Sequence, residues 1–205
     1  MSKGKYIVIE GIDGSGKSTQ LELLKNILIE RNIPFYKNIE PSSNPIGRFI
    51  RETILSGKYE TNELVRQMLF LTDRLDNFYN GRFSLENLLK EGNLIISDRS
   101  FLSGIVYGGE DGEYIHHALF DYIILPDLII YLDITPEEVM KRIDSNRGDK
   151  EIYETLEQQI KFEERYKLNL DILIRMKGIR VLYVQADLFP DTISRVIWRS
   201  VNDIL

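Results

Sequence analysis

The stretch GIDGSGKST, from Gly11 to Thr19, constrains this chain more than any other part of it. It fits the pattern Gly-x-x-x-x-Gly-Lys-Ser, and it follows an apolar run that ends at Glu10 and precedes a helical pattern. Glycines let backbone N–H groups curl around phosphate oxygens, and the start of a helix favours anions. The stretch therefore predicts a strand, a phosphate-binding loop and a helix in succession, and with them a bound nucleotide.

Two side chains of this loop are candidates for contacts with the phosphates and with a metal ion. Lys17 is expected to reach the β- and γ-phosphates, and the Ser18 hydroxyl is expected to ligate Mg²⁺. A guanine-specific switch protein would also carry Asn-Lys-x-Asp, which the sequence lacks. The loop alone does not name a reaction, so the second substrate has to be sought elsewhere in the chain.

The rest of the sequence alternates strand and helix patterns. Continuous apolar runs, which are typical of parallel strands buried on both faces, occupy 6–10, 94–97, 128–133 and 180–184, with a weaker one at 33–39. Between them, apolar residues recur at helical spacing, and a helix start is indicated at Thr135-Pro136. The pattern predicts an α/β fold with a doubly wound parallel sheet, in a single domain over 1–205.

Two of the helical stripes define expected core positions. Leu21, Leu24 and Leu28 follow the loop, and a second stripe consists of Leu64, Met68, Leu71 and Leu75.

Composition narrows the class of protein. The chain has 205 residues, 43% of them hydrophobic, no cysteine and a net charge of -6. Disulfide and thiol chemistry are excluded, and the acidic balance argues against a polynucleotide-binding surface. The N-terminus has neither a signal-peptide pattern nor a membrane span, so we expect a soluble, cytoplasmic protein that acts on small molecules.

Two further pairs of residues are candidates for binding phosphate, metal or a base. Asp98 and Arg99 come directly after a buried strand, at the edge where open α/β sheets place their chemistry. Asp98 is expected to organise Mg²⁺, directly or through water, and Arg99 to bridge the donor and acceptor phosphates; a buried structural ion pair is the alternative. Phe70 and Arg74 share one helical face, where a ring and a guanidinium are able to stack on a base and bond its carbonyl, although a core phenylalanine beside a surface arginine fits the spacing equally well.

At this point the chain resembles the thymidylate kinases, P-loop kinases that phosphorylate dTMP with ATP. The resemblance runs nearly end to end and is carried by the segments IEGIDGSGKSTQ, EP...PIG..IR...L (40–55), FLTDR (70–74), DRSFLSGIVYGG (98–109), PDLIIYLDITPEEVMKRI (126–143) and RGDKEIYE (147–154). It implies a five-stranded parallel sheet wrapped by helices, a lid at about 144–152, Mg²⁺ as cofactor and a homodimer.

The resemblance also implies site residues. The ATP site would be formed by Gly11, Ile12, Asp13, Gly14, Ser15, Gly16, Lys17, Ser18, Thr19 and Arg142, the last of these near adenine. The dTMP site would be formed by Asp13, Glu40, Phe70, Arg74, Arg99, Ser103, Gly104, Tyr107 and Tyr153. Phe70 would stack on thymine, Arg74 would contact its carbonyl edge, and Tyr107 would stand where a ribose 2′-hydroxyl would go.

The chain departs from the family pattern at several positions. Ile39 stands where many members have arginine, Ser100 where tyrosine or histidine is usual, and Gly108 where a polar side chain is common. Gly14 replaces the loop arginine of some members, which leaves Arg147 in the lid as the candidate catalytic cation beside Lys17 and Arg99.

The expected reaction is therefore transfer of the ATP γ-phosphoryl group to dTMP. Two alternatives stay open. A deoxynucleoside kinase would need a base for a sugar hydroxyl, for which Glu40 is the candidate. A non-catalytic nucleotide-binding regulator would bind without turnover. A metal site at His116-His117 is not expected, because adjacent helical residues face different directions.

Overall fold

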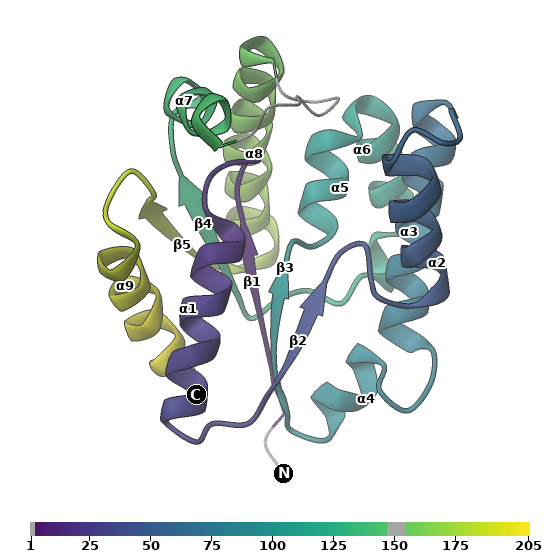
Figure 1. Ribbon diagram of the computed structural model, residues 1–205. Helices are drawn as coiled ribbons and strands as arrows, with labels where there is room; N and C mark the ends of the chain where they lie inside the picture. The colour runs from purple at the N-terminus through teal and green to yellow at the C-terminus, as the bar shows by residue number, and fades with distance from the viewer. Residues whose placement is uncertain (1–2, 147–154) are drawn as a thin grey trace. The chain divides into compact units, whose positions relative to one another are not determined.

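The computed structural model describes residues 3–146 and 155–205. The chain divides into two compact units, Met1–Tyr6 with Phe35–Pro126, and Ile7–Pro34 with Asp127–Leu205. Five parallel strands form one sheet with helices about it, in the order β2-β3-β1-β4-β5, as Figure 1 shows. The predicted α/β class is confirmed.

The bounds of the elements follow the chain order. The strands are β1 (Lys5–Glu10), β2 (Phe35–Ile39), β3 (Leu94–Asp98), β4 (Leu128–Asp133) and β5 (Arg180–Gln185). The α-helices are α1 (Lys17–Glu30), α2 (Pro45–Phe49), α3 (Glu63–Tyr79), α4 (Leu85–Lys90), α5 (Phe101–Tyr107), α6 (Gly109–Ala118), α7 (Pro136–Asn146), α8 (Leu156–Lys177) and α9 (Pro190–Asn202). A π-helical turn spans Ile50–Leu55 and a 3₁₀ turn spans Phe120–Tyr122.

The second unit is built around β1, β4 and β5. In β1 and β4 the apolar run is fully buried, from Ile7 to Ile9 and from Leu128 to Leu132. Successive side chains of a strand point to opposite faces of the sheet, so a run that is buried throughout is covered on both faces. This is why apolar residues in these runs do not alternate with polar ones. Helix α1 packs beside α9 (Figure 1).

Strand β5 is less buried than its apolar run predicts. It pairs with β4 on one side only and ends the sheet, so Tyr183 is 45% exposed while Val184 is buried. An edge position relaxes the need for apolar side chains on both faces. The apolar run located the strand correctly but did not give its place in the sheet.

The first unit contains β2 and β3, with α2 to α6. The two strands pair in parallel, with Phe35 opposite Leu94 and Ile39 opposite Asp98. Helix α3 begins after Asn62, whose side chain accepts a hydrogen bond from the backbone N–H of Val65.

The predicted core stripe of α3 is wrong in part. Leu71 is buried, but Leu64 is 40% exposed and Met68 is 55% exposed. The buried face consists instead of Gln67, Leu71, Asp73, Arg74 and Phe78. Its polar groups find partners elsewhere: Asp73 bonds to Ser42, and Arg74 bonds to Glu40, Ser100 and His116. Hydrophobicity alone therefore did not identify this face.

Candidate functional site

The phosphate-loop segment has the backbone that its glycines predict. Gly11, Gly14 and Gly16 all have positive φ, and Gly16 is the N-cap of α1. At Gly11 a side chain is also excluded by space, because a Cβ would lie 2.7 Å from Ser15 Oγ and 3.0 Å from Leu132 O. The loop therefore turns sharply from β1 into α1 and presents the helix N-terminus, an arrangement that binds anions.

Lys17 folds back over this loop. Its Nζ donates to the carbonyl oxygens of Gly11 at 2.8 Å and Ile12 at 2.9 Å, and lies 3.5 Å from Asp13 Oδ1. The side chain is only 6% exposed. The ammonium group is thus held within the loop, where phosphate oxygens would meet it.

The other predicted nucleotide contacts lie in the same unit. Ser15 is buried, while Ser18 and Thr19 are exposed in the first turn of α1. Arg142, on α7, is half-buried and its Nη2 donates to the Ala186 carbonyl at 2.8 Å. Helix α7 begins at Pro136 as predicted, with Thr135 Oγ1 accepting from the backbone N–H of Glu138.

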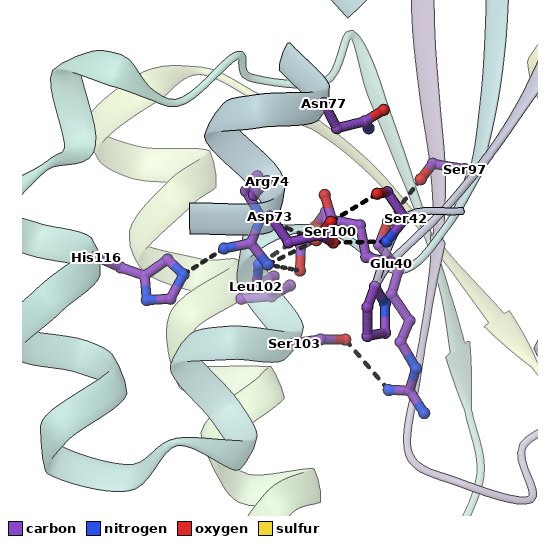
Figure 2. A network of polar contacts seen from close by, with 12 residues as sticks. Glu40, Ser42, Asp73, Arg74, Asn77, Ser97, Ser100, Leu102, Ser103 and His116 are labelled. Atoms are coloured by element: carbon purple, nitrogen blue, oxygen red, sulfur yellow. Dashed lines mark hydrogen bonds and ion pairs between the residues drawn. The ribbon is translucent and has the colours of Figure 1, made fainter. Parts of the chain in front are cut away.

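In the first unit, Arg74 is the centre of a buried polar network (Figure 2). Its side chain is 3% exposed. Nε and Nη2 donate to Glu40 Oε2 at 2.8 and 2.6 Å, and Nη2 also donates to the Ser100 carbonyl at 3.2 Å. The alternative of a surface arginine beside a core phenylalanine is wrong, because Arg74 is buried and Phe70 is the half-buried member of the pair.

His116 faces the other side of the same guanidinium. Arg74 Nη1 lies 2.5 Å from His116 Nε2, and His116 Nδ1 lies 2.7 Å from the Gly112 carbonyl oxygen. A carbonyl only accepts, so Nδ1 carries the proton and Nε2 of the neutral ring accepts from Arg74. Burial, and then the charge of Arg74, lower the pKa of His116 to about 3. The ring is therefore neutral at physiological pH.

Three glycines spaced four residues apart allow close approaches to the backbone in this region, and the first of them makes room for His116. A Cβ at Gly104 would lie 2.5 Å from His116 Cε1 and 2.7 Å from its Nε2. A Cβ at Gly112 would lie 2.3 Å from the Gly104 carbonyl oxygen, and one at Gly108 would lie 2.4 Å from Gln67 Cδ. Helices α5 and α6 therefore approach at backbone distance, and Gln67 of α3 fills the space next to Gly108.

Asp98 and Arg99 stand at the end of β3, as predicted. Arg99 has a φ of 71°, a left-handed conformation that is uncommon for a residue with a side chain and that concentrates at functional sites. Its Nη1 donates to Ser103 Oγ at 3.3 Å, and its guanidinium lies 5.1 Å from the centre of the Tyr107 ring. The structure thus gathers Arg99, Ser103 and Tyr107, three of the predicted acceptor-site residues.

Two of the departures from the family pattern have local explanations. Ser100 caps α5, with its Oγ accepting from the backbone N–H of Leu102 at 3.2 Å. The space that a polar side chain at Gly108 would need is occupied by Gln67. Nothing in the structure explains Ile39.

Some predicted residues cannot be placed, and others were missed. Arg147, Tyr153 and most of the proposed lid lie outside the described residues. Sequence reasoning missed His116 and also Asp73, whose carboxylate accepts from the Ser42 backbone N–H and hydroxyl, both at 2.6 Å. The sequence signal that could have indicated Asp73 is the helical spacing of polar residues on α3, which an analysis of hydrophobic residues alone does not detect.

Residues 3–146 and 155–205 contain no group of three or more histidine, cysteine, aspartate or glutamate side chains that could hold a metal ion. Over the same residues, every helix is too short or too polar to cross a membrane.

Comparison with known proteins identifies the family. Residues 9–191 match the family model described as thymidylate kinase. A "Probable thymidylate kinase" of Methanococcus maripaludis is 34% identical over 204 residues, which cover 98% of this chain and 93% of the relative. The thymidylate kinase of Carboxydothermus hydrogenoformans is 33% identical, with 88% of this chain and 89% of the relative covered. A "Probable thymidylate kinase" of Pyrobaculum aerophilum is 38% identical over 78% of this chain and 80% of the relative. Because the family model covers most of the chain and the relatives named thymidylate kinase align along nearly its whole length, the chain belongs to the thymidylate kinase family.

Proposed function

We propose that this protein transfers the γ-phosphoryl group of ATP to the 5′-phosphate of dTMP, giving dTDP and ADP, in the biosynthesis of dTTP. The observation that carries the proposal is the match to relatives named thymidylate kinase over nearly the full length of both chains. The glycine-rich loop at the N-terminus of α1, with Lys17 held inside it, supplies the phosphate-binding chemistry that such a reaction needs.

The reaction requires positioning and charge neutralisation rather than a general base. The acceptor phosphate of dTMP has a second pKa near ~6, so one of its oxygens is already a nucleophile at pH 7. That oxygen attacks the γ-phosphorus as the bond to the ADP oxygen breaks, and the developing charge is met by cations. We assign these roles to Lys17, Arg99 and Arg147. The lid role of Arg147 and the closure of Tyr153 over thymidine remain predictions.

The acceptor site is assigned to the residues gathered around β3, α3 and α5. Phe70 is half-buried and stacks on thymine, Arg74 bonds the base, and Arg99 holds the 5′-phosphate. Tyr107, against which the Arg99 guanidinium lies, blocks the position of a ribose 2′-hydroxyl. Glu40, Ser103 and Gly104 complete this set, because Glu40 and Gly104 adjoin Arg74 and Ser103 binds Arg99.

On the donor side, the loop residues from Gly11 to Thr19 bind the phosphates of ATP, and Arg142 on α7 lies near adenine. Asp13, whose carboxylate lies 3.5 Å from Lys17 Nζ, also contacts the sugar 3′-hydroxyl of dTMP. These assignments rest on the family pattern and on the exposure of the first turn of α1.

A divalent cation, Mg²⁺, is proposed as the cofactor. The Ser18 hydroxyl is exposed in the first turn of α1, and the Asp98 carboxylate is half-buried at the end of β3. Hydroxyl and carboxylate oxygens suit Mg²⁺, which in kinases takes most of its remaining ligands from phosphates and water. When bound, the ion would neutralise phosphate charge.

The alternative of a deoxynucleoside kinase is not favoured. It would require Glu40 as the base for a sugar hydroxyl, yet Glu40 Oε2 accepts two hydrogen bonds from the buried guanidinium of Arg74. That carboxylate is committed to an ion pair in which both side chains are almost fully buried. A non-catalytic regulator is the remaining alternative, and turnover distinguishes it.

The test is a coupled assay of ADP release with ATP·Mg²⁺ against dTMP, dUMP, dCMP, dGMP and thymidine. The proposal predicts that dTMP is the best acceptor by kcat/KM. A much higher kcat/KM for thymidine would establish the nucleoside kinase instead, and nucleotide binding without turnover would establish the regulator. The single-domain organisation and the cytoplasmic location remain predictions from the sequence pattern, to be tested by limited proteolysis and fractionation. The homodimer remains a prediction from the family resemblance, to be tested by ultracentrifugation.

A further inference from the structure

We infer that His116 is a positioning residue for the nucleobase site: its Nε2 fixes the Arg74 guanidinium, so that the one remaining Nη1 N–H is directed at an acceptor on the base. The inference rests on the proposed function, in which Arg74 bonds the base, and goes beyond it by naming what holds Arg74 in place. Two observations on the structure carry it.

The first observation is how the donors of Arg74 are used. Each terminal nitrogen of arginine carries two N–H groups, and Nε carries one, all in one plane. Glu40 receives the Nε and one Nη2 hydrogen, the Ser100 carbonyl receives the other Nη2 hydrogen, and His116 Nε2 receives one Nη1 hydrogen. Among the residues that the structure describes, the second Nη1 hydrogen has no hydrogen-bond partner. It is the donor left for a ligand.

The second observation is the space made for the imidazole. Glu40 and Ser100 hold one edge of the guanidinium, and within 3–146 and 155–205 it is His116 that holds the Nη1 corner (Figure 2). The ring reaches that corner only because position 104 has no Cβ, which would overlap His116 Cε1 and Nε2. On its far side, Nδ1–H is held by the Gly112 carbonyl, which sets the tautomer.

The imidazole of His116 is suited to accept a hydrogen bond at all physiological pH values and not to act as a pH-dependent switch. Two cations in contact would repel, so a protonated ring would drive Arg74 away. Burial and the charges of Arg74 and His117 oppose protonation and hold the pKa of His116 near 3, while the Gly112 carbonyl acts in the other direction. The acceptor is thus present throughout the pH range in which an enzyme of this class works.

A matched pair of substitutions separates positioning from simple packing. His116→Gln places Oε1 near the position of Nε2 and keeps the acceptor for Arg74, but loses the Nδ1 donor. His116→Asn keeps a donor near Nδ1 for the Gly112 carbonyl, but its side chain is too short to reach Arg74. Each variant loses the ring and one of the two hydrogen bonds, so a purely structural role predicts equal effects on substrate binding.

The experiment measures the dTMP dissociation constant by calorimetry and KM and kcat by the ADP-release assay. His116→Asn is expected to raise the dissociation constant and KM for dTMP roughly tenfold, with kcat and the KM for ATP changed by less than about threefold. His116→Gln is expected to restore most of that binding. His117→Asn, at the exposed neighbouring position, is the control and should leave all four values unchanged.

Gly104→Ala tests the same contact if His116→Asn fails to fold. Its Cβ would occupy the place of the ring while residue 116 stays a histidine, so it should also raise the KM for dTMP. Equal losses in the Asn and Gln variants, or an unchanged KM in His116→Asn, would overturn the inference. If the wild-type protein turns over dTMP but the His116→Asn and His116→Gln variants bind dTMP equally well, only the role of His116 is refuted. If the wild-type protein does not bind dTMP, the proposed function is refuted as well.

Discussion

Acidification should destabilise this protein through His116, and the size of the effect follows from its environment. In an unfolded chain a histidine has a pKa near ~6.5. In the folded protein, burial first and the Arg74 charge second lower the pKa of His116 to about 3. Between these two values the unfolded chain binds a proton that the folded protein does not, so the free energy of unfolding falls as the pH falls.

The magnitude can be worked out for a chosen pH. The contribution of His116 is fully present above the unfolded pKa of about 6.5 and is lost progressively towards the folded value. At pH 5.0, about 1.5 units below the unfolded pKa, proton binding by the unfolded chain costs about 2 kcal/mol of stability. At pH 7.5 the cost is close to zero. The side chain is fully buried, so screening by solvent does not reduce this figure.

The assay is urea unfolding at pH 7.5 and pH 5.0, followed by circular dichroism. Carboxylates also titrate in this range, so the quantity to compare is the loss of stability in the wild type minus the loss in His116→Gln. We expect a difference of about 2 kcal/mol. His117→Gln changes the only other histidine, which is exposed, and should behave like the wild type. If His116→Gln and wild type lose the same stability, His116 is not held neutral by the fold and the reasoning is refuted.

Three further predictions concern the candidate site. Lys17→Ala should nearly abolish ADP release and, because two loop carbonyls lose their donor, should also lower the free energy of unfolding by about 1–3 kcal/mol; near-normal kcat would contradict the assigned role. Tyr107→Ala should narrow the ratio of kcat/KM between dTMP and its ribose analogue, since the ring blocks the 2′ position; an unchanged ratio would remove this gate. Gly108→Ser should cost about 1–3 kcal/mol in urea unfolding, because its Cβ meets Gln67 and the Gly104 carbonyl, and Gln67→Ala should recover part of that loss.

The phosphate loop could be predicted from the sequence because its signals are local. The loop glycines with positive φ, the strand before them and the helix after them all lie between Lys5 and Glu30, and every one of them leaves a mark on the sequence. The buried strands were found for a similar reason, since a parallel strand covered on both faces must be apolar throughout. What the runs did not encode was the order of the strands, so β5 was expected to be more buried than it is.

The acceptor side was harder because its burial is polar. The stripe Leu64, Met68, Leu71 and Leu75 satisfied a helical period, yet the helix turns Arg74 and Asp73 inward instead. A charged side chain is buried only when partners replace water. Here the partners are the residue after β2, the N-cap of α5 and a residue near the end of α6, which are distant in the sequence. The spacing of apolar residues within one helix does not predict polar partners that come from distant segments.

Yet one trace of the network is present in the sequence, in the spacing of its glycines. Gly104, Gly108 and Gly112 recur every four residues across the junction of two helices, where glycine is otherwise unfavourable for helix formation. Such a cost at three regular positions indicates that something approaches the backbone there, and each of the three positions is in fact met by a backbone carbonyl or a polar side chain. The first of them admits the ring of His116 to Arg74. The glycine repeat therefore marks where a backbone carbonyl or a polar side chain comes close to the helix backbone, even though the sequence does not say which group it is.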